Sequence, residues 1–284
     1  FRPVISLYNR RFQVSGRWQT LKLLNWFDWF NSFKAFDFKQ PIQPIKQMKP
    51  IRQVFKTLNF ETVNFEPLNV EPEPKIVISA SRRTDIPAFY MSWFMDRIKS
   101  GFFEVVNPYN RQTRKVTATP AEVHTIVFWS KNFQPFLRKN WGKKLQKAGY
   151  HLFFNFTINS ESQRLEPHVP PLDVRLDQLK QLCDQFGSRA VNWRFDPICF
   201  FKARTPDGML QDNLNDLDRI AEKAAKLGIK RCITSFMDVY PKIGKRLAAL
   251  PGFSFSDPPL KIKGQIILKI EKILACGNIN LKLC

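Results

Sequence analysis

The feature that most constrains this fold is an alternation of short apolar segments with amphipathic segments, which begins at Lys75. The apolar segments have the length of buried strands. The segments at residues 172–186 and 210–224 keep apolar residues three or four positions apart, as helices do. Such an alternation predicts a parallel sheet with helical crossovers. The predicted strands are residues 75–80, 102–106, 125–129, 152–157, 190–195, 230–236 and 279–283.

Two α/β architectures fit seven strands with right-handed crossovers: a (β/α) barrel that lacks its last unit, and a doubly wound sheet. We favour the barrel because this architecture takes about 250 residues, and residues 75–284 supply most of that length. The sequence ends within the seventh predicted strand, so the barrel is expected to be incomplete.

Residues 1–74 have a different character. Prolines interrupt the segment, aromatic residues occur in it without a helical or strand period, and an Asn-x-Glu pattern recurs every five residues from Asn59. This composition predicts a basic, largely irregular extension or linker. We therefore place a domain boundary before Lys75, with the barrel-like domain at residues 75–284.

Charge and cysteine usage narrow the class of protein. The sequence carries 45 Lys and Arg against 24 Asp and Glu, a formal charge of +21, which attracts nucleic acid or anionic small molecules. No apolar run approaches the ~20 residues of a membrane span, and no signal peptide is visible. The five cysteines show no close pair and no metal-type spacing. These features predict a cytoplasmic protein that does not enter a membrane.

Polar residues follow the predicted strands. The strand at residues 75–80 runs into Arg82, Arg83, Thr84 and Asp85 before Pro87 opens a helix. Asp85 alone could simply cap that helix, but a cap does not explain the two arginines. Loops that leave the carboxyl ends of parallel strands meet at one rim, so later polar residues are expected around the same mouth. They are Asn107, Lys131, Asn132, Asn155, Arg194, Asp196, Ser235 and Asp238.

These rim residues divide into two chemical groups. Asp85, Asp196 and Asp238 are the candidate catalytic residues, because carboxylates can transfer protons or hold a divalent metal. The sequence has no glycine-rich phosphate loop and no zinc signature, so we assign no metal site. The candidate anion-binding residues are Arg82, Arg83, Thr84, Asn107, Lys131, Asn132, Asn155, Arg194 and Ser235.

Five motifs in this region resemble, in the same order, a bacterial family of domains of unknown function. They read ISASRRTDIPAFY from Ile78, NPYN from Asn107, VFWSKN from Val127, WRFDPI from Trp193 and SFMDVY from Ser235. Members of that family carry a carboxyl-terminal cysteine cluster similar to the Cys-x3-Cys-x2-Cys of radical S-adenosylmethionine enzymes. The resemblance implies a [4Fe-4S] cluster and S-adenosylmethionine as cofactors of a full-length protein.

This sequence departs from the family pattern at the cluster. Its cysteines, at positions 183, 199, 232, 276 and 284, lack the required spacing. A truncated gene, a fragment and a member that lost the chemistry would each explain this, and Phe1 together with the end inside a strand favours a fragment. We therefore expect no cofactor and no activity in this chain alone.

Three functions remain in view. The leading one is a radical S-adenosylmethionine-like enzyme that acts on an anionic substrate in its full-length form. The second is a metal-dependent barrel hydrolase or phosphoesterase that uses Asp85, Asp196 and Asp238. The third is a basic nucleic-acid-binding protein without enzymatic activity.

Overall fold

The computed structural model describes residues 6–8, 75–81, 84–107, 110–202, 209–238 and 253–284. These residues belong to one compact unit. Most of the predicted extension at residues 1–74, together with Arg82 and Arg83, lies outside the described residues. The extension and its boundary therefore stay predictions.

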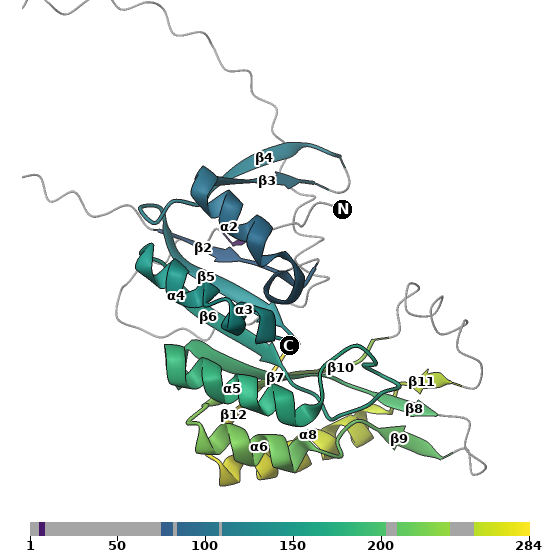
Figure 1. The fold of residues 1–284 in the computed structure, drawn as a ribbon. Helices are drawn as coiled ribbons and strands as arrows, with labels where there is room; N and C mark the ends of the chain where they lie inside the picture. Colours follow the sequence, from purple (N-terminus) through teal and green to yellow (C-terminus); the bar gives the residue numbers. More distant parts are fainter. Residues whose placement is uncertain (1–5, 9–74, 82–83, 108–109, 203–208, 239–252) are drawn as a thin grey trace, which may run out of the picture. The chain divides into compact units, whose positions relative to one another are not determined.

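A parallel sheet of six strands forms the centre of this unit (Figure 1). The strand order is β2-β5-β6-β7-β10-β12, and β1 (Ser6–Tyr8) joins the β2 edge in the antiparallel sense. The predicted α/β class is confirmed, and six of the seven predicted strands lie in this sheet. The parallel strands are β2 (Ile76–Ser79), β5 (Val123–Ser130), β6 (His151–Thr157), β7 (Val191–Ile198), β10 (Arg231–Phe236) and β12 (Asn280–Leu283).

The order of the parallel strands in the sheet is their order in the sequence. Right-handed crossovers that always step in one direction place every helix on the same face of a sheet. Contacts between neighbouring helices agree with a single layer, because η2 contacts α3, α3 contacts α5, α5 contacts α6, and α6 contacts α8. The elements of this layer are η2 (Ile86–Tyr90), α2 (Met91–Ser100), α3 (Gln134–Arg138), α4 (Trp141–Lys147), α5 (Leu172–Phe186), α6 (Leu217–Lys226) and α8 (Leu260–Cys276).

The predicted strand at residues 102–106 has a different role from the one expected. It forms β3 (Phe102–Val106), which pairs antiparallel with β4 (Thr113–Thr117) in a separate hairpin, so its assignment to the parallel sheet was wrong. Only Phe103 and its cross-strand partner Val116 are fully buried. A central parallel strand is covered on both faces and is almost continuously apolar, whereas this hairpin has one buried side.

A second correction concerns the segment at residues 210–224. Leu210–Asp212 is β9, which pairs with β8 (Phe200–Lys202), and α6 begins only at Leu217. With β11 (Ser254–Ser256) these strands form a small antiparallel sheet in the order β11-β8-β9. The helical spacing of Leu210 and Leu214 was therefore fortuitous. The small sheet lies at the carboxyl end of β7, beside the candidate site described below (Figure 1).

The two faces of the central sheet differ in chemistry. On β5 and β6 the even-numbered Phe128, Phe154 and Phe156 are completely buried among aromatic rings of the helix layer. Burial of such a side chain stabilises the fold by about 1.5–3 kcal/mol. Because side chains alternate along a strand, the odd-numbered residues of β5 and β6 point to the opposite face. On β7 that opposite face carries Asn192, Arg194 and Asp196.

Candidate functional site

Asp85 links the end of β2 to the end of β5. Its Oδ1 accepts a hydrogen bond of 3.0 Å from the backbone N–H of Ala88 and so caps η2. Its Oδ2 accepts bonds from Ser130 Oγ at 2.7 Å and from the Lys131 N–H at 3.2 Å. Burial raises the pKa of Asp85, and these hydrogen bonds oppose the rise. Both carboxylate oxygens of Asp85 are therefore engaged in hydrogen bonds, and the bond from Ala88 is the helix cap that the sequence allowed.

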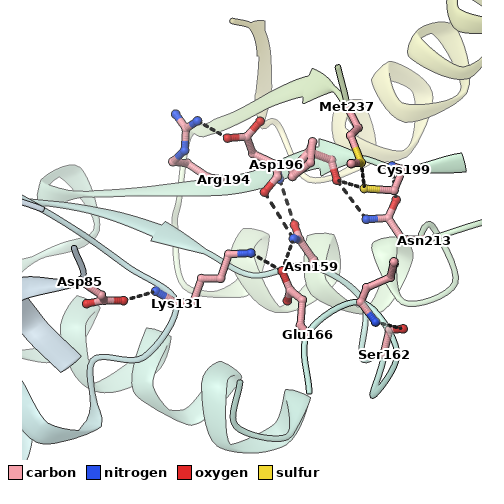
Figure 2. Close-up of polar contacts among 12 residues, drawn as sticks. Asp85, Lys131, Asn159, Ser162, Glu166, Arg194, Asp196, Cys199, Asn213 and Met237 are labelled. Carbon is pink, nitrogen blue, oxygen red and sulfur yellow. Dashed lines mark hydrogen bonds and ion pairs between the residues drawn. The ribbon is translucent and has the colours of Figure 1, made fainter. Parts of the chain in front are cut away.

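Lys131 continues the contacts toward β6 and β7. Its Nζ forms an ion pair with Glu166 Oε1, which also accepts a 2.9 Å bond from Asn159 Nδ2. The Asn159 side chain bonds to the backbone of Asp196 as well, accepting from its N–H at 2.9 Å and donating to its carbonyl at 3.3 Å. Asp196 in turn pairs with Arg194. We call this connected set, Asp85, Lys131, Glu166, Asn159, Asp196 and Arg194, the rim network (Figure 2).

Arg194 is the most enclosed cation of the rim network, with 9% of its surface exposed. Its Nη2 contacts Asp196 Oδ2, and Ser235 Oγ donates to the other oxygen of the same carboxylate. The guanidinium carbon lies 4.9 Å from the centroid of the Trp129 ring, in cation–π geometry. Trp129 is itself held by a 3.0 Å bond from its Nε1 to Ser79 Oγ. Arg194 is thus presented in a fixed orientation on the face of the sheet that carries none of the described helices, which we call the helix-free face.

A buried arginine on the helix layer supports the rim network. Arg175 on α5 is 2% exposed and donates 2.8 Å bonds to the carbonyls of Pro170 and Asn159. Burial lowers its pKa, while Glu166, Glu161 and Asp216 oppose the change. The bond to Asn159 connects the rim network to the helix layer, so α5 fixes the loop that follows β6.

A cavity of about 470 Å³ adjoins the rim network. One wall is the loop that continues from Asn159, and the other is β9 with the turn after it. Asn213 connects the cavity wall to the carboxyl end of β7, because it lines the cavity, donates a 3.0 Å bond to the Pro197 carbonyl and accepts a 2.9 Å bond from the Cys199 N–H. The volume falls in the range of small-molecule pockets. The lining residues are Ser160, Glu161, Ser162, Arg164, Leu165, Phe201, Leu210, Gln211, Asp212, Asn213 and Asn215.

The structure brings five of the predicted site residues together. Asp85, Lys131, Arg194 and Asp196 belong to the rim network, and Ser235 bonds to Asp196. Sequence reasoning missed Asn159, Glu166 and Arg175 as functional residues. Asn159 comes just after a predicted strand and could have been chosen on that ground. Glu166 lies in a loop and Arg175 on a helix, so no sequence signal pointed to either of them.

The remaining predicted residues are not members of the rim network. Asn132 Oδ1 accepts a 3.0 Å bond from the Gln134 N–H at the start of α3, and Asn155 accepts a 3.3 Å bond from Asn192 Nδ2 within the sheet. Asp238 is exposed, and Asn107 follows the β3 hairpin strand. Thr84 is half-buried beside Asp85, while Arg82 and Arg83 fall outside the described residues.

The described cysteines do not fit an iron–sulfur cluster. They lie on separate elements, and no group of three or more His, Cys, Asp or Glu in the described ranges could hold a metal ion. Burial raises the pKa of Cys183 to about 11 and the pKa values of Cys199 and Cys232 to about 12. Cluster ligands are thiolates, which these three environments disfavour.

No helix among the described residues is long and apolar enough to cross a bilayer.

Comparison with known proteins gave one family. A family model described as "Domain of unknown function (DUF1848)" matches residues 77–284. The match covers the helix layer, almost the whole parallel sheet and every residue of the rim network. No curated protein matched the sequence. The family resemblance read from the five motifs is therefore confirmed.

Proposed function

This chain belongs to the DUF1848 family of domains of unknown function, and we propose that it binds a small anionic molecule at the carboxyl end of its parallel sheet. The observation that carries the proposal is the placement of Arg194. A nearly buried guanidinium is held on the helix-free face of the sheet by an indole ring and a carboxylate. Arginine in such a setting suits recognition of carboxylate or phosphate groups.

Arg194 keeps donor capacity for a ligand. A guanidinium has five N–H groups. Among the described residues its hydrogen-bond partners are Asp196, through Nη2, and the Cys284 thiol, 3.8 Å from Nη1. Lys131 supplies a second cation on the same rim, with 40% of its side chain exposed. We propose that the anionic group of the ligand lies against Arg194 and that Lys131 contributes charge.

The architecture we propose for this site is an incomplete (β/α) barrel. A strand order without reversal and a single helix layer support it, because a doubly wound sheet reverses its order and carries helices on both faces. In a barrel the helix-free face becomes the interior. The rim network would then lie at the mouth, where barrel enzymes place their active sites.

The reaction type we propose follows from the family resemblance: an enzyme of the radical S-adenosylmethionine-like type acting on the anionic ligand. A bound cluster with its cofactor would supply the radical. The described cysteines do not fit that group, so the roles assigned here are limited to binding and orientation by Arg194, Lys131 and Asn159. The metal-dependent alternative is less supported, because Asp85 uses both carboxylate oxygens in hydrogen bonds and Asp238 lies outside the rim network.

The test measures the tryptophan fluorescence of the protein while inorganic phosphate or succinate is added. An anion that binds Arg194 changes the surroundings of the Trp129 ring, so saturable quenching or enhancement is expected. Trp129→Phe should remove most of that change. Arg194→Lys keeps the charge but loses the planar fork, and we expect binding weakened by about tenfold or more. Comparing phosphate with succinate separates the two ligand chemistries.

Lys180→Gln is the matched control, because Lys180 is an exposed cation on α5 that pairs only locally with Asp184. It should bind as the wild type does. Circular dichroism of each variant guards against a folding defect. Unchanged binding by a folded Arg194→Lys variant, or no saturable response of the wild type to either anion, would disprove the proposal.

A further inference from the structure

A long part of the sequence lacks acidic residues. Between Glu122 and Glu161 there is no Asp or Glu, whereas the same stretch holds six Lys and Arg residues. One of the six, Lys131, is paired with Glu166 in the rim network. The other five lie on α3, α4 and the turn between them, and we call them the α3–α4 basic surface: Arg138, Lys139, Lys143, Lys144 and Lys147.

The five side chains are exposed, and none of the ion pairs found among the described residues involves them. Two other helices of the layer carry charges that are paired one turn apart, Lys180 with Asp184 on α5 and Lys226 with Glu222 on α6. On α4, Lys143 and Lys147 are one turn apart, which places their attachment points about 6 Å from each other along the axis. The α3–α4 basic surface therefore carries positive charge that no ion pair among the described residues neutralises.

We propose that the α3–α4 basic surface binds the phosphate backbone of a nucleic acid, without reading its bases. Charge complementarity selects a polyanion. A membrane surface fits less well, because helices that bind bilayers insert exposed apolar side chains. The apolar residues Leu137 and Leu145 of α3 and α4 are buried, and the large exposed hydrophobic residues of the described chain lie on other elements.

Trp141, the aromatic residue of α4, supports backbone contact over base stacking. Trp141 at the start of α4 is half-buried, and Lys144 Nζ lies over its ring at 4.3 Å from the centroid. Proteins that hold single strands use open aromatic faces as stacking platforms. Here a cation already occupies one face of the ring. We therefore expect affinity that depends on salt and is indifferent to base sequence.

The experiment measures fluorescence anisotropy of labelled duplex DNA of two unrelated sequences over a series of salt concentrations. The wild type should bind both sequences equally, with log K falling linearly against log salt. The triple variant Lys139→Gln, Lys143→Gln, Lys147→Gln removes three cations and leaves the Lys144–Trp141 contact intact. Its salt slope should be shallower by about 2–3, since each phosphate contact contributes about 0.9.

A matched control removes the same charge from another helix. Lys261, Lys269 and Lys272 are exposed on α8 and form no ion pair among the described residues, so the triple Lys→Gln variant at these positions should bind like the wild type. Equal losses in both triple variants would show a diffuse charge effect and overturn the proposal. So would sequence-dependent binding that persists at high salt. Retained DNA binding by the α3–α4 triple, with loss of its binding to phosphatidylserine vesicles, would reassign the surface to membranes.

Discussion

At the residue scale, Asp85 shows how one side chain can serve both local and distant structure. Its two carboxylate oxygens serve different elements, one at the start of η2 and the other at the end of β5. The short side chain of an aspartate reaches a backbone N–H three residues ahead, which makes it a good cap. The second set of bonds spans 45 positions in the sequence. No local sequence pattern predicts such a bond, because it depends on which strands become neighbours in the sheet.

Replacing Asp85 by Ala should lower the free energy of unfolding by about 2–4 kcal/mol, since a cap is lost, the Lys131 N–H loses its acceptor, and Ser130 Oγ keeps only the Asn132 carbonyl. Urea denaturation measures this value. Asp85→Asn keeps a capping oxygen and should lose less, because the amide can still accept from Ala88. An alanine variant as stable as the wild type would show that these bonds contribute nothing.

The stability that Asp85 contributes should depend on pH in a definite direction. Burial raises the folded-state pKa of Asp85 above 3.8, so the folded state binds the proton more readily than the unfolded state. Stability contributed by this group is present below 3.8 and declines as pH rises through the folded pKa. Wild type should therefore lose stability relative to Asp85→Asn as pH rises from 3.8 through the folded-state pKa of Asp85. An opposite trend would contradict the burial effect.

At the element scale, helix α4 approaches the aromatic core through a glycine. A Cβ atom added to Gly142 would collide with the Phe186 ring and would lie 3.0 Å from Phe136 Cε1. Gly142 is thus required by packing, in a position where helix propensity alone favours alanine. This also explains how the basic side chains of α4 stay outside, since the helix is anchored by its glycine and by buried Leu145.

Gly142→Ala should destabilise the protein by about 1–2 kcal/mol, because overpacking outweighs the gain of about 1 kcal/mol in helix propensity. Gly264→Ala on α8 is the matched control. Nothing lies within 4 Å of the added methyl group there, so that variant should be more stable than the wild type by up to about 1 kcal/mol. Thermal unfolding of both variants compares them directly. The two variants should change the unfolding temperature in opposite directions. Destabilisation of both variants would contradict the packing argument.

The elements were predicted from sequence with uneven success, for physical reasons. Periodicity identified six parallel strands and the helix at Leu172–Phe186, because buried strands and amphipathic helices repeat their apolar residues at different intervals. It assigned β3 wrongly because a hairpin strand and a buried strand can share two adjacent phenylalanines. The rim was predictable in outline, since polar residues followed several strands. Glu166 and Arg175 were not, because tertiary contact alone brings them to Asn159.

At the scale of the whole molecule, the described cysteines are distributed as structural thiols. Cys232 is completely buried in β10, and Cys199 lies 3.5 Å from the Met237 sulfur beside the small antiparallel sheet. Cys276 ends α8 and Cys284 follows β12, both exposed. A [4Fe-4S] cluster requires thiolates that converge on one cube of iron and sulfur. These positions do not supply that arrangement.

The 284-residue chain should therefore remain colourless after anaerobic reconstitution with iron and sulfide. Iron analysis and the visible charge-transfer absorbance give the result. About four irons per chain, retained through gel filtration, would contradict the expectation. A Cys276→Ser, Cys284→Ser variant is the control for iron held loosely by the two exposed thiols, and it should behave as the wild type does.

On strand β7, correct folding and the formation of the rim network depend on the same strand register. Trp193 and Phe195 alternate along it with Arg194 and Asp196. If the pairing register of β7 shifted by one residue, every side chain would move to the other face of the sheet. Arg194 and Asp196 would then lie among the aromatic rings of the helix layer, and Trp193 and Phe195 would lie on the opposite face. Such a chain would be unstable and would lack the rim network. For an engineer, this strand forbids insertions and deletions.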